Sequence, residues 1–525
     1  MNDQEHKQLV KSTAVITGPT ILSRILGYLR DMLQAFYLGT STGADAFTIA
    51  YIIPNLLRRL MGEGALTAAF IPTFTQIKKK ESKDNTWNFA NTVFYNLVLI
   101  AAGITILGII FSPFLVKIIA IGYKQVPGKW ELTTNLTRIM FPYIFFISLA
   151  ALCMSILNSF FKFAVPASTP VLFNIAIIVT ALVLAQRTEE PAFAFAIGVV
   201  IGGVLQLAFQ IPFLWRLGMK FKPNVSFTHP AMVKIGKLMV PGIFGLGISQ
   251  INLALSRMLA SLLAEGSAAA LYYATRVREL TLGLFSIALS IALLPTLSEQ
   301  AAEENIPGMK KTLIFSLKLI ILITIPAFLG LLILAKPIIQ VLFERGAFGI
   351  ESTSMTVSAL VFFSIGLPFI SGCKILTSVF YSLKDTKTPV IIGFFIMIIY
   401  LSSSFLLMHP LAVGGIALAL SIAEIINFFA LWLFLEKKIG FISKKEILLS
   451  ISKVIICSGL MGLVLWSLIN QIQYQQFIFL KKLGFLVISI IMGLITYFLA
   501  SLIFNWSDLK SLKKIFLKKS NTEIE

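Results

Sequence analysis

Residues 17–74 read TGPTILSRILGYLRDMLQAFYLGTSTGADAFTIAYIIPNLLRRLMGEGALTAAFIPTF, and this stretch decides the fold. Its two apolar segments are long enough to cross a bilayer, yet they carry Arg24, Arg30, Arg58 and Arg59. An arginine at the centre of a membrane helix costs about 2.5–3.5 kcal/mol on insertion scales. We therefore expect these side chains to line a cavity within a helical membrane protein and to face something anionic.

The composition of the whole chain agrees with that interpretation. Of 525 residues, 57% are hydrophobic and 13% are charged, which is typical of an all-α polytopic membrane protein. The apolar runs are about 20 residues or longer, whereas the strands of a membrane barrel need only about ten. Hydropathy predicts fourteen transmembrane helices, centred near residues 26, 60, 103, 145, 175, 203, 249, 284, 326, 367, 397, 424, 459 and 493.

Positive charge collects in the connections between apolar runs. The chain has 44 Lys and Arg against 24 Asp and Glu, a net charge of +20, with clusters such as KKKESK at 78–83 and KSLKKIFLKK at 510–519. The richest connections follow even-numbered spans, so the positive-inside rule predicts that both termini are cytoplasmic. We expect these clusters to face anionic membrane lipids and not nucleic acid. The chain is therefore predicted to cross a membrane many times.

The sequence carries no motif for catalysis. It has no GxxxxGK[ST], HExxH or GxSxG motif, and its three cysteines and three histidines are scattered. We therefore predict no enzyme activity, no metal and no cofactor. The energy source is expected to be the membrane potential or a gradient of a monovalent ion.

An internal duplication organises the chain. PTFTQ at 72–76 recurs as PTLSEQ at 295–300, and SFFKFAVPASTPV at 159–171 recurs as SVFYSLKDTKTPV at 378–390. A six-helix unit that occurs twice in the same orientation predicts two lobes with a cavity between them. We predict an N-terminal lobe over residues 1–220, a C-terminal lobe over 221–440, and two additional helices with a basic tail over 441–525.

The first two spans supply the first candidate binding residues. At about 100° per residue, Arg24 and Asp31 fall on one face of span 1, and Arg30 lies on an adjacent face. Span 2 presents Asn55 and Arg58 on one face. A structural alternative exists, because Arg30 and Asp31 are neighbours that could form an ion pair and neutralise each other.

The duplication makes spans 7 and 8 the counterparts of spans 1 and 2. Span 7 contributes Arg257, and span 8 contributes Arg276 and Glu279 on one face. The last two are spaced for a structural ion pair at i and i+3. Basic residues outnumber acidic ones across the four spans, so pairing cannot neutralise them all.

Two acidic residues lie near opposite ends of span 2. Asp45 and Glu63 are either interface residues or groups for gating and coupling, and periodicity does not choose between these interpretations. Arg59 and Arg278 lie off the main faces, so they are interpreted as side chains that extend to the cytoplasmic interface. The remaining guanidinium groups suit a pyrophosphate, because each donates two parallel hydrogen bonds and keeps its charge.

Six motifs carry a family resemblance. In order they are LSRILGYLRD at 22–31, GADAF at 43–47, IPNLLRRLMGEGALTAAFIP at 53–72, ALLPTLS at 292–298, LFERGAF at 342–348 and YSLKDTKTPV at 381–390. Together they resemble the MurJ (MviN) family of lipid II flippases, in the multidrug/oligosaccharidyl-lipid/polysaccharide exporter superfamily. The resemblance runs from about Thr13 to at least Leu435.

The resemblance implies fourteen helices in two six-helix lobes that alternate between inward-open and outward-open forms. It implies transport of undecaprenyl-pyrophosphate-linked MurNAc-pentapeptide-GlcNAc, lipid II, to the outer leaflet of the bacterial cytoplasmic (inner) membrane for peptidoglycan synthesis. In the family the last two helices form a groove proposed to hold the lipid tail. By motif, the family's functional residues correspond to Arg24, Arg30, Arg58, Arg276, Asp45 and Glu279.

This sequence also departs from the family pattern. Thr275 stands where many members have an acidic residue, and Arg278 is an additional basic residue. Spans 7, 11 and 12 show no convincing carboxylate cluster for sodium. Two other functions stay open: a flippase or exporter for a different polyprenyl-pyrophosphate glycan or other substrate of this superfamily, and a non-transporting scaffold for envelope enzymes. Cell-wall synthesis proteins are therefore candidate partners.

Overall fold

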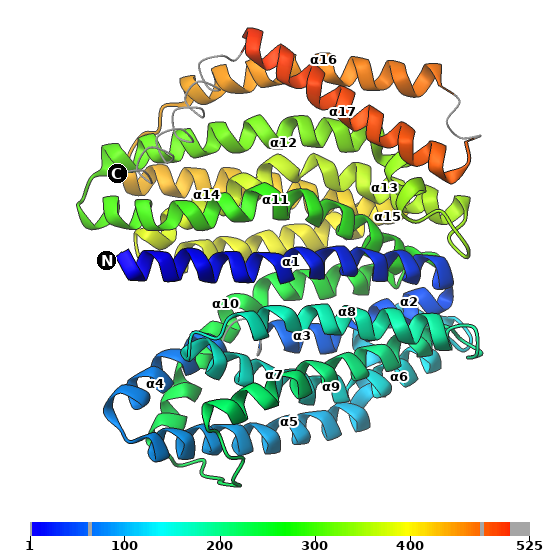
Figure 1. Cartoon of the computed structure of the whole chain (residues 1–525). Helices are drawn as coiled ribbons and strands as arrows, with labels where there is room; N and C mark the ends of the chain where they lie inside the picture. Colours follow the sequence, from blue (N-terminus) through cyan, green and yellow to red (C-terminus); the bar gives the residue numbers. More distant parts are fainter. Residues whose placement is uncertain (1–2, 61–65, 473–476, 505–525) are drawn as a thin grey trace. The chain divides into compact units, whose positions relative to one another are not determined.

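The computed structural model describes residues 3–60, 66–472 and 477–504, and in these ranges every regular element is a helix (Figure 1). The chain forms two compact units. Unit 1 comprises the described residues up to Ala269 together with Arg345–Phe348. Unit 2 comprises Ala270–Glu344 and the described residues from Gly349 onward. The predicted division at residues 220 and 440 rests on the sequence repeat and stays a prediction.

Unit 1 is built from ten α-helices, one short 3-10 helix and the first residues of an eleventh α-helix. The helices are α1 (Asp3–Leu38), α2 (Thr42–Ala50), α3 (Ile52–Leu60), α4 (Leu66–Lys80), α5 (Lys83–Ile119), η2 (Ile121–Gln125), α6 (Lys129–Met140), α7 (Pro142–Ser159), α8 (Ala164–Leu184), α9 (Ala192–Leu217) and α10 (Pro230–Ala260).

Unit 2 contains most of α11 and the six helices that follow it. They are α11 (Ser267–Ala302), α12 (Ile306–Leu342), α13 (Ile350–Ile365), α14 (Leu367–Ser382), α15 (Lys387–Ile439), α16 (Lys444–Gln471) and α17 (Phe479–Phe504).

Eight helical stretches in the described ranges are long and apolar enough to cross a membrane, and the bent pair of α13 and α14 makes a ninth. The protein is therefore a multi-span helical membrane protein, as predicted. Two of the eight stretches are composite, because one joins α6 to α7 and another runs through all of α15. The count of fourteen stays a prediction.

The second predicted span is divided into three helices. Ser41 begins α2, with its Oγ accepting a hydrogen bond from the backbone N–H of Ala44 at 3.3 Å. Helix α2 ends at Ala50, and Pro54 removes the N–H that would bond the carbonyl group of Ala50, which favours the interruption at Tyr51. Glu63 lies outside the described residues.

Unit 2 also contains broken helices. Between α13 and α14 the axis turns by 45° at Gly366. Within α15 the backbone leaves the helical region at Ala412, where φ is +46°, shortly after Pro410. The sequence predicts two spans in this stretch, and the interruption at Ala412 divides it at the predicted place.

Aromatic side chains form the core of unit 1. The rings of Phe70 and Phe74 on α4 stack at 5.1 Å, and Phe89 on α5 stacks on Phe70 at 6.3 Å. Trp87 stacks on Phe160 at 5.4 Å. These rings join α4 and α5 to the end of α7, so the PTFTQ motif at 72–76 contributes to packing through Phe74.

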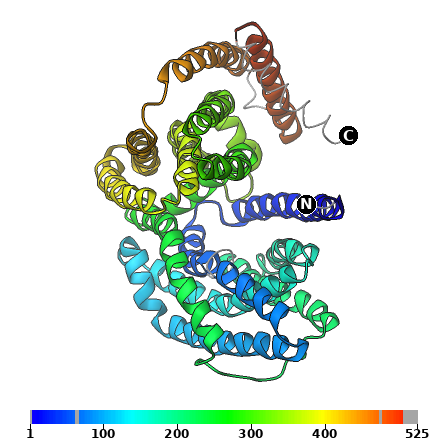
Figure 2. The same cartoon turned by 90° about the vertical axis from the view of Figure 1, so that its left-hand side faces the viewer.

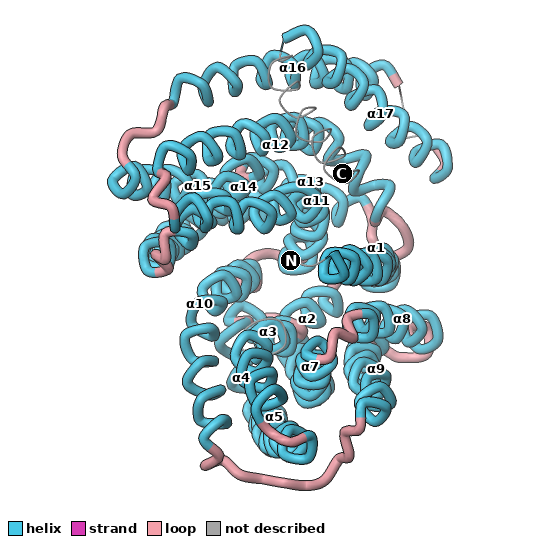
Figure 3. The backbone as a smooth tube through the Cα atoms, turned by 60° about the vertical axis from the view of Figure 1, so that its left-hand side comes forward, coloured by secondary structure: helices cyan, strands magenta, loops and turns pink. Residues whose placement is uncertain are grey.

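The segment that links α9 to α10 runs along α5 (Figure 3). The amide of Asn91 donates to the carbonyl of Lys220, and the amide of Asn96 donates to the carbonyl of Ser226, both at 2.8 Å. Helix α10 then packs against α3, α4 and α5. The linker is therefore held on unit 1 by side chains of α5, which sequence periodicity does not reveal.

The last two helices, α16 and α17, pack against α12 in unit 2 (Figure 2). Leu334 of α12 meets Met461 and Leu465 of α16 in a small apolar cluster. The hydroxyl of Tyr497 on α17 donates to the carbonyl of Leu322 at 2.6 Å. This bond ties the end of the chain to the interior of unit 2.

Apolar side chains also cover the outer surface. On α5, Ile106, Ile110 and Phe114 repeat every four residues and are 57–60% exposed. A soluble protein seldom exposes such a stripe, whereas a membrane helix needs it to face hydrocarbon. The stripe on α5 therefore fits a surface that faces lipid.

Candidate functional site

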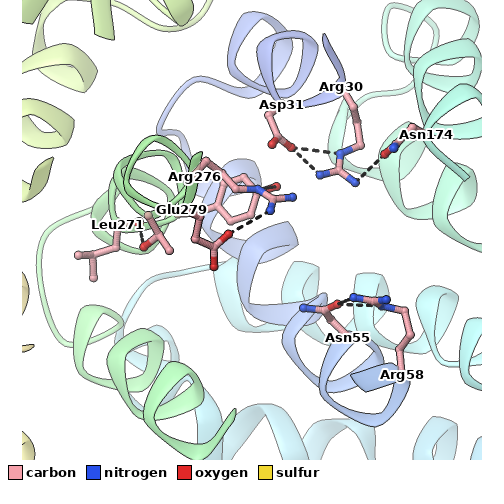
Figure 4. A network of polar contacts seen from close by, with 10 residues as sticks. Arg30, Asp31, Asn55, Arg58, Asn174, Leu271, Arg276 and Glu279 are labelled. Atoms are coloured by element: carbon pink, nitrogen blue, oxygen red, sulfur yellow. Dashed lines mark hydrogen bonds and ion pairs between the residues drawn. The ribbon is translucent and has the colours of Figure 1, made fainter. Parts of the chain in front are cut away.

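Arg30 is held in a buried network between α1 and α8 (Figure 4). Its guanidinium group donates to Asp31 Oδ1 at 2.7 and 3.1 Å and to Asn174 Oδ1 at 3.1 Å. Asn174 in turn donates to the carbonyl of Ser23 at 3.0 Å. The structural interpretation of Arg30 and Asp31 as an ion pair is thus confirmed in geometry.

Arg24 lies on a different face of α1 from Arg30. Its side chain is exposed, whereas Arg30 is only 8% exposed. The two arginines of the first span therefore have different environments. The exposed one has room for a ligand, while the buried one already uses its donors within unit 1.

Arg58 and Asn55 lie together on α3, as the helical periodicity predicts. Arg58 donates from Nε and from one terminal nitrogen to Asn55 Oδ1, each at 3.2 Å (Figure 4). Both side chains are half-buried, so the guanidinium group is oriented but stays accessible. The side chain of Arg59 lies outside the described residues.

Asp45 sits at a fully buried junction of unit 1. One carboxylate oxygen accepts hydrogen bonds from Lys129 Nζ at 2.7 Å and from the N–H of Gly266 at 2.8 Å. The other oxygen accepts from the N–H of Ala269 at 2.9 Å. Asp45 thus caps the start of α11 and neutralises a lysine of α6. Through these contacts Asp45 joins α2 to α6 and to the start of α11. Its role at an interface or in gating and coupling stays a prediction.

Arg257 is buried at the end of α10. It is 4% exposed and donates from a terminal nitrogen to the carbonyl of Ala268 at 2.8 Å. This bond spans the connection between α10 and α11. Its predicted role in substrate binding stays a prediction, and its described contact is with backbone.

In unit 2, Arg276 and Glu279 lie on the exposed face of α11. Arg276 donates to Glu279 Oε2 at 3.4 Å and to the hydroxyl of Tyr272 at 3.3 Å (Figure 4). The side chains of this ion pair are 31% and 44% exposed, so the pairing is weak. Arg276 is therefore available to an anionic ligand that could replace Glu279.

Arg278 does not extend to the interface, which corrects the sequence-based interpretation. It is 8% exposed, donates to Glu424 Oε1 at 3.1 Å, and lies over the ring of Phe363 at 4.6 Å. The error arose because a partner 146 residues away, on α15, is invisible to helical periodicity.

The structure adds three residues that sequence reasoning did not select: Asn174, Lys129 and Glu424. Lys129 has no signal of its own, because a single lysine at the start of a helix does not indicate a buried partner. Glu424 had a usable signal, because it is a single carboxylate in the apolar run ALALSIAEIINFFALW at 417–432. Among the described residues, no group of three His, Cys, Asp or Glu is placed to hold a metal ion.

An apolar groove of about 660 Å³ lies between α12, α14, α15 and α16 in unit 2. Aromatic rings line it, including Phe328, Phe369, Phe429 and Trp432. Lys444 is the charged residue in the lining. The groove has the dimensions and polarity of a site for a hydrocarbon chain.

Long apolar helices that carry arginines and buried ion pairs on their inner faces define a multi-span membrane transporter. Solved structures agree on the fold: an inward-facing multidrug resistance MATE family transporter of the MOP superfamily matches with a TM-score of 0.67 at 14% identity, covering 81% of this chain and 98% of that one. The chain belongs to the lipid II flippase MurJ family, whose model matches residues 34–487.

Individual relatives support the family assignment over most of the chain. The probable lipid II flippase MurJ of Haemophilus influenzae is 35% identical, covering 91% of this chain and 96% of its own length. The lipid II flippase MurJ of Burkholderia cenocepacia is 33% identical, covering 82% and 84%. A solved structure of lipid II flippase MurJ in an inward closed conformation matches with a TM-score of 0.78 at 29% identity, covering 94% and 98%.

Proposed function

We propose that this protein moves lipid II from the inner to the outer leaflet of the bacterial cytoplasmic membrane by alternating access. Family membership over residues 34–487 is the observation that carries the proposal. The proposal is also supported by the exposed Arg24 and the accessible Arg58 and Arg276, because binding of a pyrophosphate needs several guanidinium groups. The rest of the proposal concerns how this chain would perform that transport.

The proposed architecture has fourteen spans. Nine stretches pass the test of length and hydropathy. Division of α15 at Ala412 adds a tenth span, and the charged helices α1, α10 and α11 together with the broken series α2 to α4 bring the count to fourteen. An even number supports the proposal that both termini are cytoplasmic, in line with the positive connections.

The proposed binding residues fall into two groups. Arg24, Arg58 and Arg276 contact the pyrophosphate, since each has an exposed or half-buried guanidinium group. Arg30 and Arg257 are proposed to support the site from inside unit 1, because their described donors are used by Asn174, Asp31 and a backbone carbonyl. Asn55 orients Arg58 through Oδ1.

The acidic residues are proposed to act as gates or exchangeable partners. Glu279 holds Arg276 until the pyrophosphate replaces it, which the long 3.4 Å contact favours. Asp45 closes a junction of α2, α6 and α11. Asp31 pairs with Arg30. Glu63 keeps its predicted role in gating, although it lies outside the described residues.

The groove of unit 2 is proposed to accept part of the polyprenyl tail. Its apolar lining matches a hydrocarbon, and Lys444 at α16 provides a cation for the anionic surface of the membrane. The family resemblance supports this assignment only in part, because α16 lines the groove and α17 does not. The headgroup would remain with the arginines.

The deciding experiment replaces the native protein with Arg24→Ala, Arg58→Ala or Arg276→Ala and measures lipid II in the outer leaflet. We expect each variant to reduce flipping by about tenfold or more, because a charged hydrogen bond contributes about 1.5–3 kcal/mol. Arg187→Ala is the control, since Arg187 is exposed in the loop after α8 and has no proposed role. Normal flipping by all three folded variants contradicts the proposed site and favours a scaffold.

Arg→Lys at the same three positions tests the geometry of the site. Lysine keeps the charge but loses the planar fork, so we expect flipping to remain well below that of the unsubstituted protein. Full activity of the lysine variants would mean that charge alone is sufficient and that bidentate contact with the pyrophosphate is not made.

A further inference from the structure

Glu424 on α15 is an unusual carboxylate inside unit 2. It is 8% exposed and lies within a helix that is otherwise apolar on both sides of it. Oε1 accepts the hydrogen bond from Arg278, whereas Oε2 is buried and has no hydrogen-bond partner among the described residues. Burial of a carboxylate oxygen costs hydration free energy, and without a donor no hydrogen bond offsets this cost.

The unpartnered oxygen points at the break between α13 and α14. A Cβ atom built on Gly366, where the axis bends by 45°, would meet Glu424 Oε2 at 2.2 Å. Ser421, one helical turn before Glu424, accepts the N–H of Gly366 at 3.1 Å and donates to the carbonyl of Phe362 at 2.6 Å. Glycine at 366 is therefore what lets the carboxylate enter the bend.

Backbone hydrogen bonding is interrupted at the same bend. Pro368 has no N–H, so the carbonyl of Ser364 cannot receive the ordinary helical hydrogen bond. A helix that ends at Ile365 leaves carbonyl groups of its last turn without helical partners. The carbonyl of Ser364 instead receives the N–H of Gly366, so the backbone at this bend is not bonded as in a continuous helix.

Charged and titratable groups approach Glu424 from two neighbouring helices. Arg278 comes from α11, and the next residue on that helix is Glu279. From α14, Lys374 is half-buried and interacts electrostatically with Arg278, Glu424 and Glu279, and Cys373 donates its thiol to the backbone carbonyl of Glu424 at 3.7 Å. On α13 the facing group is the ring of Phe363, which carries no charge.

Arg278 keeps a favourable contact when its anionic partner is neutralised. Its guanidinium group lies 4.6 Å from the centroid of Phe363, so the cation remains over the face of an aromatic ring in either state of Glu424. Neutralisation of Glu424 therefore does not leave the arginine without interactions.

We propose that Glu424 is a proton-binding site, and that a proton on its carboxyl group releases Arg278 and loosens the contact of α11 and α15 with the bend at Gly366. The proton comes from water and binds to the carboxylate oxygen, which becomes a neutral acid; Arg278 keeps its charge. A proton needs one lone pair, whereas hard metal cations need several oxygen ligands. Among the described residues, Glu424 belongs to no group of three His, Cys, Asp or Glu side chains that could hold a metal ion.

The first test is an infrared titration of the full-length protein in lipid nanodiscs. A carboxylic acid C=O band is expected to appear on acidification in the unsubstituted protein, to be absent from Glu424→Gln, and to persist in the matched control Glu279→Gln, whose side chain is 44% exposed. The same band in Glu424→Gln would overturn the proposal. If that variant does not fold, the double variant Arg278→Met with Glu424→Gln, which removes both charges, replaces it.

A glycine pair tests the geometry of the bend. Gly366→Ala places a Cβ against Oε2, so its band should shift in frequency or in titration midpoint. Gly330→Ala on α12 is the control, because a Cβ at that position meets nothing within 4 Å. An unchanged band in Gly366→Ala would contradict the placement of the acid in the bend.

The second test concerns transport and rests on the proposed function. Flipping of lipid II in proteoliposomes is expected to be about fivefold slower at about pH 8 than at about pH 6. At the higher pH Glu424 is ionised, and its ion pair with Arg278 keeps α11 and α15 in contact with the bend at Gly366. In Glu424→Gln the two rates should agree within about twofold. Equal pH dependence in both proteins overturns the coupling. Absence of flipping in the unsubstituted protein contradicts the proposed function instead, and the infrared result remains separate.

Discussion

Asp45 shows how a charge is held at depth in this protein. Its carboxylate is 1% exposed and receives Lys129 Nζ and two backbone N–H groups. Each oxygen has a donor, so the desolvation cost is offset by hydrogen bonds and charge. Arg30 follows the same rule with Asp31 and Asn174. Arg24 is not buried in this way, because its side chain is exposed. Burial therefore distinguishes the residues proposed to support the site from those proposed to bind the substrate.

The pair of Asp45 and Lys129 predicts a stability effect. Asp45→Asn leaves the lysine buried without a counter-charge and is expected to cost about 3–5 kcal/mol. Lys129→Met with Asp45→Asn removes both charges and should cost less. Thermal unfolding of the purified protein in detergent measures the effect. Glu279→Gln is the matched control, because its exposed ion pair should contribute about 1 kcal/mol or less. Equal stability of Asp45→Asn and that control would contradict the prediction.

Asp385, which lies in the connection between α14 and α15, is expected to make the stability of the folded protein depend on pH. Burial raises the pKa of this carboxyl group, but Lys438 Nζ at 2.5 Å and the hydroxyl and N–H of Thr388 hold its pKa well below the ordinary value of 3.8. The folded state therefore gains stability from the ionised group above about pH 3.8, and this gain is lost as the pH falls through the lower folded pKa.

The measurement is the midpoint of thermal unfolding followed from neutral to acidic pH. Asp385→Asn should be less stable than the unsubstituted protein at neutral pH, and the difference should shrink as the solution becomes strongly acidic. A difference that stays constant through the acid range would show that the carboxylate is not responsible.

At the scale of helices, glycine decides which pairs approach closely. On α9, a Cβ at Gly198 would lie 2.2 Å from Thr180 Oγ1 and 2.8 Å from Ile177 Cα of α8. A Cβ at Gly202 would meet the ring of Phe173 at 2.6 Å. The two glycines are one turn apart, and they allow the backbones of α8 and α9 to pack together, as small residues do in membrane helix pairs.

Gly198→Ala is expected to destabilise unit 1 by about 1–3 kcal/mol, because the Cβ would overlap backbone atoms of α8 that cannot move independently. Gly103→Ala on α5 is the control. A Cβ there meets nothing within 4 Å, so alanine should be neutral or should stabilise the helix by up to about 1 kcal/mol. The measurement is the midpoint of thermal unfolding of the two variants in detergent. If Gly198→Ala and Gly103→Ala destabilise the protein equally, the close contact at Gly198 is refuted.

The spans themselves were predictable at this scale, but their breaks were only partly so. Pro54 and Pro410 indicate the interruptions near Tyr51 and Ala412, because proline removes a helical hydrogen bond. The bend at Gly366 has the same signal in Pro368, which removes the N–H that would bond the carbonyl of Ser364. What stabilises that bend is Ser421, which comes from another helix.

At the scale of the whole molecule, the distribution of charge predicts how the chain crosses the membrane. Lys80 ends α4 in a basic cluster, and Gln125 lies in the connection between α5 and α6. Both side chains are exposed. With cytoplasmic termini, these two positions fall on opposite sides of the bilayer.

Cysteine labelling checks that prediction in intact cells. Cys153, Cys373 and Cys457 are buried and give little background reaction. Gln125→Cys should react with an impermeant thiol reagent added outside, whereas Lys80→Cys should react only with a permeant one. The reverse pattern would invert the proposed topology. Reaction of both positions with the impermeant reagent would indicate that the membrane or the fold is damaged.

The sequence by itself determined the class of fold and the family, and it predicted the internal duplication and the helix faces that carry Arg24, Arg58 and Arg276. These depend on local periodicity, composition and motif order, which a linear chain contains. Only the tertiary structure decided which other charges are neutralised, because Asp45 and Arg278 find their counter-charges, Lys129 and Glu424, on distant helices, whereas the counter-charge of Arg30 is its neighbour Asp31. Ion pairing depends on distances of a few ångströms between side chains, and packing sets those distances. The arginines of residues 17–74 are therefore not equivalent: Arg30 supports the fold, and Arg24 and Arg58 stay accessible.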